Sequence, residues 1–242
     1  MRLFVFLKEL HDKIAEHSKK LTFDKKHALH RNLVALYGSL IELTAGIIIL
    51  IDRKARTGVP PLFRTFLETY VEFRNLVADP KYGYFMDASY HDQWLKVLRE
   101  AEKGANPYLA DIAKLPNLVD HIRHTERELE TLKKKSYFPL SVFKKFECAG
   151  MVSEYRSLYN FLSADSHSNI RALINRHIEL GKEDFEIVFY KDTPLEDFLT
   201  FIDSTCGLLI DASIRIHEYL NSPVVYSIRS LQEKLQEIRK QV

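Results

Sequence analysis

Two sets of polar residues at helical spacing carry side chains suited to acid–base and phosphate chemistry. The first set interrupts an apolar stretch and consists of Arg64, Glu68, Glu72 and Asn75. These positions are i, i+4, i+8 and i+11, so they share one face of an α-helix. On a solvated face, Arg64 and Glu68 form an ordinary ion pair worth about 0.2–0.5 kcal/mol. Between packed helices, the same stripe forms a polar pocket, and the sequence leaves both interpretations open.

The second set contains one titratable imidazole. Its members are Arg156, Tyr159, Ser163 and His167, at positions i, i+3, i+7 and i+11. His167 falls at the expected end of its helix, where the helix dipole favours a protonated imidazole and therefore a general acid. The string from Ser163 to Asn169 is also rich in capping residues, so helix termination is the alternative. Ser163 with His167 does not indicate a serine hydrolase, because no nucleophile elbow accompanies them.

The remaining motifs predict neither a metal nor a cofactor. The chain has no P-loop, no GxGxxG and no Glu-x-x-His, which are the usual signatures of nucleotide-cradling loops and di-iron bundles. His27 with His30, and His121 with His124, each share a helical face, but neither pair has a visible third ligand. The two cysteines form no CxxC motif, and the first residues lack a secretory pattern, so we expect a cytoplasmic protein.

Composition favours long helices. The chain has 242 residues, of which 46% are hydrophobic, and only 8 Gly and 8 Pro, which are too few for the many turns of a β-sandwich or barrel. We predict an all-α, multi-helix bundle of about eight to ten helices with at most one short strand or hairpin. Lys and Arg total 35 against 33 Asp and Glu, so the net charge of +2 indicates no dedicated polyanion binder.

Apolar periodicity and capping residues position the elements in a single domain, residues 1–242. The expected helices cover residues 2–20, 24–54, 60–77, 84–103, 117–135, 140–148, 151–165, 169–180, 194–220 and 223–240, with a short one after Asn106-Pro107. Residues 185–190 are strand-like and are expected as half of a hairpin or as extended packing. The C-terminal amphipathic helix, within residues 223–242, either packs on its own bundle or mediates association with a partner.

Residues 33–51 are apolar enough to suit either a membrane span or a core helix. Glu42 is the only charge among them, and a carboxylate in mid-membrane costs about 2.5–3.5 kcal/mol. We therefore expect a core helix and no membrane association. A buried Glu42 needs a polar partner, and Arg64 is the candidate.

Two short motifs resemble a known family. Arg64-x2-Leu67-Glu68, followed later by Tyr159-x2-Leu162-Ser163-x3-His167, resembles the bacterial helical DUF5677 proteins, a family with no agreed activity. The helical layout is also similar to the HEPN superfamily, which includes RNA-cutting toxins and phage-defence effectors. Those ribonucleases carry Arg, four to six residues, then His, and here Arg171-x5-His177 matches that spacing.

Two functional hypotheses follow. The first is a metal-independent ribonuclease of HEPN type acting on RNA in bacterial antiphage defence or as a toxin. His167 or its rival His177 would move the proton, and Arg64 or Arg171 would stabilise charge on the phosphate. The second is a non-enzymatic helical module, a homodimer or the accessory protein of a partner. In it, the polar cluster, namely Glu42, Arg64, Glu68, Tyr159, Ser163 and His167, would be structural.

Overall fold

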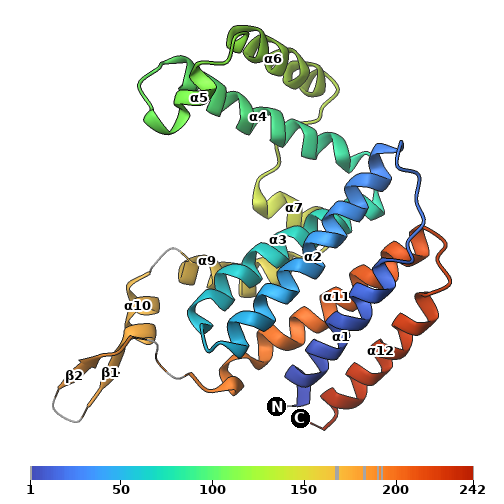
Figure 1. The fold of residues 1–242 in the computed structure, drawn as a ribbon, viewed down its shortest axis with the longest axis vertical. Coiled ribbons are helices and arrows are strands. Elements are labelled where there is room, and N and C mark those ends of the chain that lie inside the picture. The colour runs from blue at the N-terminus through green and yellow to red at the C-terminus, as the bar shows by residue number, and fades with distance from the viewer. Residues whose placement is uncertain (1, 167–168, 182–183, 190, 192, 242) are drawn as a thin grey trace. The chain divides into compact units, whose positions relative to one another are not determined.

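A computed structural model of the chain describes residues 2–166, 169–181, 184–189, 191 and 193–241 (Figure 1). The longer helices are α1 (Arg2–Ser18), α2 (Ala28–Asp52), α3 (Val59–Ala78), α4 (Tyr82–Glu102), α6 (Leu118–Lys134), α11 (Leu199–Tyr219) and α12 (Val225–Arg239). The shorter ones are α5 (Ala110–Ala113), α7 (Val142–Cys148), α8 (Val152–Glu154), α9 (Asn160–Ser166) and α10 (Ile170–His177). The 3-10 turns are η1 (Arg56–Gly58), η2 (Pro107–Leu109) and η4 (Leu195–Phe198). The predicted all-α fold is confirmed.

The chain divides into two compact units where the sequence predicts a single domain. Unit 1 comprises Met1–Ala78 and Phe146–Val242, and unit 2 comprises Asp79–Lys145. In unit 2, α4 packs on α6 through a small apolar cluster. Its buried members are Ala88, Leu95, Leu98, Leu118, Ile122 and Leu129.

The core of unit 1 is formed by apolar stripes on α1, α2, α3, α11 and α12. On α2 the buried residues are Leu33, Tyr37, Leu40, Thr44, Ile47 and Ile51, which recur every three or four positions. The first and last helices run side by side (Figure 1), and Lys234 of α12 contacts Glu9 of α1 at 2.6 Å. The C-terminal helix therefore packs on its own unit, the first of the two arrangements that the sequence allowed.

By length and composition, α2 is the only helix among the described residues that is apolar enough to cross a membrane. Its side opposite the core presents Ala35, Ser39 and Glu42, together with one large apolar side chain, Ile49. Because one face of α2 is already packed against α1, α3 and α11, we expect the protein to purify without detergent. Recovery of the protein only from detergent-solubilised membranes would contradict this expectation.

The segment predicted as one helix over residues 151–165 is interrupted. A π-helical turn, η3 (Tyr155–Tyr159), separates α8 from α9. The next predicted helix is shorter than expected, because after α10 the chain turns into an antiparallel hairpin of β1 (Ile178–Leu180) and β2 (Phe185–Ile187). The register pairs Ile178 with Ile187 and Leu180 with Phe185, so the strand-like run is half of a hairpin.

Candidate functional site: a polar cluster and a cationic cavity

A polar cluster ties α3 to the π-helical turn. The Nε of Arg64 donates to Oε1 of Glu68 at 3.0 Å, and its Nη2 donates to the Tyr159 hydroxyl at 2.8 Å. The Tyr159 hydroxyl in turn donates to the same Glu68 oxygen at 2.9 Å. Arg64 and Glu68, two members of the α3 stripe, therefore contact a residue of another element.

The π-helical turn positions Tyr159. Such turns insert one residue into a helix and redirect the side chains beyond it, and they are frequent at functional sites. The Tyr159 ring packs against Phe146 and Tyr155, with ring centroids 5.1 and 5.2 Å apart, and the Arg64 guanidinium lies 5.0 Å from its centroid. The ring is buried, so its hydroxyl is held at the edge of the helical core.

The hydrogen bonds in this cluster stabilise the charge of Arg64. Burial alone would lower the pKa of Arg64, but its bonds to Tyr159 and Glu68 outweigh burial and raise it. Burial, followed by the hydrogen bond to Glu68, raises the pKa of Tyr159, so its proton stays on the phenol. Within the described residues, the cluster therefore links the Arg64 guanidinium, the Glu68 carboxyl group and a neutral phenol.

The other predicted members of this site are Ser163, His167 and Glu42. Ser163 lies in α9, one turn after Tyr159, and is half-buried. His167 lies outside the described residues, so its position relative to Arg64 stays a prediction. The prediction that Glu42 is buried is wrong, because the structure places this residue on the exposed side of α2. The reason is geometric: Glu42 is nine residues from both Leu33 and Ile51, about 900° around the helix, which is the opposite face.

Replacing Arg64 by alanine should lower the free energy of unfolding by about 1.5–3 kcal/mol, the usual range for hydrogen bonds to charged groups. The Arg64 side chain is only 21% exposed, whereas Glu68 is 41% exposed and can be rehydrated, so the full penalty of a stranded buried charge is not expected. Urea unfolding measures the change. Lys20→Ala breaks the exposed i,i+4 pair with Glu16 and is the matched control. Equal effects of the two substitutions would mean that the cluster is merely solvated.

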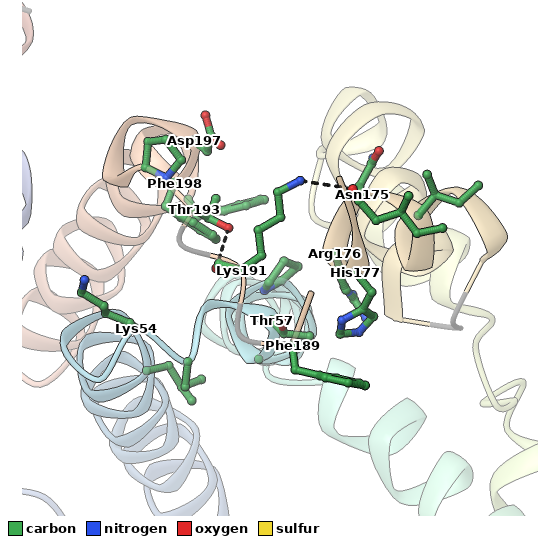
Figure 2. A pocket seen from close by; sticks show the side chains of 18 of the residues that line it. Lys54, Thr57, Asn175, Arg176, His177, Phe189, Lys191, Thr193, Asp197 and Phe198 are labelled. Carbon is green, nitrogen blue, oxygen red and sulfur yellow. Dashed lines mark hydrogen bonds between the residues drawn. The ribbon is translucent and has the colours of Figure 1, made fainter. Parts of the chain in front are cut away.

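A cavity of about 970 Å³ lies elsewhere in unit 1, where five segments meet. They are the end of α2, the start of α3, α9, α10 with the hairpin, and the residues leading into α11 (Figure 2). Pro60 lines this cavity, and Arg64 follows it by one turn on the same face of α3. The cavity and the polar cluster are therefore neighbours along one helix.

His177 lies on the wall of the cavity in a defined orientation (Figure 2). Its Nδ1 is 3.2 Å from the carbonyl oxygen of Val188. A carbonyl oxygen only accepts, so Nδ1 carries a proton, and in the neutral ring Nε2 is the basic nitrogen. The backbone amide of Val188 also donates to the carbonyl oxygen of His177 at 2.8 Å. Two hydrogen bonds therefore hold these two residues together. This arrangement suits a general base.

The charged side chains that line the cavity are mostly cationic. Among the described residues that line it, Lys54, Arg176 and Lys191 are basic and Asp197 is acidic. The Nζ of Lys191 donates to the carbonyl oxygen of Ile178 at 3.4 Å and lies 3.9 Å from a carboxylate oxygen of Glu179, so its side chain extends toward β1 (Figure 2). Cations gathered in a concave site attract anions such as phosphate, because their fields add where water is partly excluded.

Of the predicted pair Arg171 and His177, only His177 lines the cavity. Arg171 is exposed and is not among the residues lining the cavity. Six residues advance about 600° around a helix, so the two side chains point about 120° apart. Arg176 lines the cavity instead. Sequence reasoning missed Lys54, Arg176 and Lys191, because no common period relates them: they come from the turn after α2, from α10 and from the stretch between β2 and η4. Only the Arg176-His177 dipeptide could have been noticed.

In the part of the chain that the structure describes, no three His, Cys, Asp or Glu side chains gather as metal ligands would. A protein-family model described as a family of unknown function, DUF5677, matches residues 30–186. That span includes the polar cluster and His177. Comparison with curated proteins and with solved structures finds no match.

Proposed function

We propose that this chain, which belongs to the DUF5677 family, binds RNA in the cationic cavity and cleaves it with His177 as general base. The observation that carries the proposal is the fixed orientation of His177, whose Nδ1 donates to Val188 while its ring lines a cavity with three cationic side chains. A general base needs a defined lone pair within reach of its substrate, and this hydrogen bond supplies the first condition.

The reaction that these groups suit is attack of a ribose 2′-hydroxyl on the adjacent phosphorus. Nε2 of His177 accepts the proton of the 2′-hydroxyl, the new P–O bond forms, and the bond to the 5′ oxygen breaks. The 5′ oxygen takes a proton from water, and the products are a 2′,3′-cyclic phosphate and a 5′-hydroxyl. Lys54, Arg176 and Lys191 stabilise the negative charge that grows on the phosphate oxygens.

An HEPN-like toxin or antiphage effector of bacteria is the biological setting we propose for such a nuclease. Uncontrolled RNA cleavage in the cytoplasm stops growth, so expression of the wild-type chain in a bacterial host should arrest growth, and His177→Ala should relieve the arrest. Equal growth arrest by both proteins would remove His177 from the toxic activity.

The biochemical test uses purified protein, an oligoribonucleotide and its all-deoxy counterpart, in buffer containing EDTA. We expect cleavage of the RNA alone, with 2′,3′-cyclic phosphate ends, because the deoxy strand lacks the attacking hydroxyl. Intact RNA after prolonged incubation, or equal cleavage of DNA, would contradict the proposal.

A non-enzymatic interaction module is the second candidate, and one observation favours it. The hairpin and its flanks carry apolar side chains with large exposed fractions, 84% for Leu180 and 76% for Phe189. Exposed apolar patches of this kind mark association surfaces. In this alternative, a protein partner or a second copy covers the hairpin and the Arg64 cluster only fixes helix register. Substitutions at His177 would then leave every cellular phenotype unchanged.

A further inference from the structure

The cavity has an aromatic side as well as a cationic one. Phe161 and Phe189 line it with exposed fractions of 64% and 76%, whereas Phe198 and Phe201 are buried at its floor. Exposed aromatic rings beside cations are the elements with which proteins hold nucleotides, since every base has a face that stacks on a ring. An aliphatic wall would provide no comparable preference for planar ligands.

One of the exposed aromatic rings lies beside the imidazole. Phe189 precedes Lys191 by two residues, and its ring centroid is 6.3 Å from that of His177. Figure 2 shows Lys191 crossing the cavity, with Arg176 and His177 on one side of it. A planar group stacked on Phe189 therefore lies next to the imidazole of His177, in a cavity that Arg176 and Lys191 also line.

The volume also bears on the ligand. About 970 Å³ is at the upper end of the range of roughly 300–1,000 Å³ for small-molecule sites, and it is much larger than an inorganic anion requires. It accommodates a base, a sugar and a phosphate together. Charge, aromatic surface and volume thus favour the same class of ligand.

We propose that the cavity binds one nucleoside monophosphate unit, with the base on Phe189 and the phosphate at Lys191 and Arg176. The inference rests on the proposed function only in placing the ribose beside His177. The unit has two possible sources, a free nucleotide or one residue of an RNA chain, and the chemistry of recognition is the same for both.

Titration calorimetry with adenosine 3′-monophosphate, adenosine and inorganic phosphate tests the proposal on the wild-type protein. Because stacking and charge each contribute, we expect the monophosphate to bind at least about 10-fold more tightly than either fragment. Binding of the monophosphate no tighter than that of inorganic phosphate would overturn the proposal.

Matched pairs of variants locate the ligand. Phe189→Leu should weaken binding of the monophosphate about 10-fold, whereas Phe185→Leu, an exposed ring of the same hairpin outside the cavity, should not. Arg176→Gln should also weaken it about 10-fold, and Arg171→Gln on the same helix should not. Circular dichroism checks that each variant is folded. Equal effects within either pair would overturn the placement.

The affinities of the His177→Ala variant for the monophosphate and for an eight-residue oligoadenylate distinguish the two sources of the nucleotide unit. This variant is used because it should not cleave the oligoadenylate. Binding of the oligonucleotide at least 10-fold more tightly indicates an RNA chain, and equal affinity indicates a free nucleotide. If RNA is never cleaved but the monophosphate binds as expected, the proposed nuclease fails and the nucleotide site stands. If RNA is cleaved but the monophosphate does not bind, the nucleotide site fails alone.

Discussion

Replacing His177 by alanine should lower the rate of RNA cleavage by about 10²–10⁴-fold, the usual contribution of a general base. The substitution removes Nε2, the only proton acceptor that the proposal assigns, and leaves the cationic side chains of the cavity in place. The affinity for uncleaved RNA should change little, because binding depends mainly on phosphate contacts. Single-turnover cleavage and equilibrium binding, measured on the same preparation, separate these two effects.

Two further variants, one at a histidine and one at an arginine, distinguish His177 from the alternative catalytic residues. His167→Ala tests the rival imidazole, and Arg171→Ala tests the sequence motif from which His177 was first identified. We expect cleavage by both variants to stay within about threefold of wild type, a change of under 1 kcal/mol. Loss of cleavage with His167→Ala but not with His177→Ala would instead assign the reaction to the stripe of Tyr159 and Ser163.

Acid should destabilise the protein by about 3 kcal/mol between pH 6.5 and pH 4 through one residue of α11. His217 is fully buried, and neither ring nitrogen has a hydrogen-bond partner within the described residues. Burial, with a smaller effect of His17, lowers its pKa from 6.5 to about 4. Below pH 6.5 the imidazole of His217 is protonated in the unfolded chain, whereas in the native chain it stays neutral down to about pH 4. The free energy of unfolding therefore falls as the pH falls.

Urea unfolding at pH 7.5 and at pH 4.5 measures this loss, and His217→Leu isolates its origin. Leucine fills a similar volume and does not titrate, so the variant should lose much less stability on acidification than the wild type. His27→Gln replaces a histidine of the same unit that folding leaves exposed, and it is the control. A wild-type loss that His217→Leu does not reduce would assign the acid sensitivity to other groups.

Most of the fold could be predicted because its helices bury one face. Apolar residues on α1 and α11 recur every three or four positions, so the pattern alone places the helices. The interruption at Tyr155–Tyr159 could not be predicted in this way, because a π-helical turn changes the register by one residue without changing the composition. The separation of unit 2 was missed as well, since α4 and α6 have the same amphipathic pattern as helices of the larger unit.

The site was predictable in part, and the limit again has a physical cause. Arg64 and Glu68 share a stripe on the long helix α3, so periodicity places them together. Their contact with Tyr159 depends on the π-helical turn at Tyr155–Tyr159, which periodicity does not predict. The cavity is instead formed by chain ends and a hairpin, where no period relates one lining residue to the next. All of unit 2 and parts of unit 1 separate Lys54 from Lys191 in sequence, so only tertiary structure brings them to one cavity.

The most direct measurement of the central claim, that RNA binds in the cavity beside His177, is photo-crosslinking followed by peptide mapping. An oligoribonucleotide containing 4-thiouridine is irradiated with His177→Ala, so that the strand stays intact. We predict crosslinks to residues that line the cavity, such as Lys54, His177, Phe189 and Lys191. Crosslinks confined to residues 79–145 or 225–239, or none above those of a boiled sample, would contradict the account.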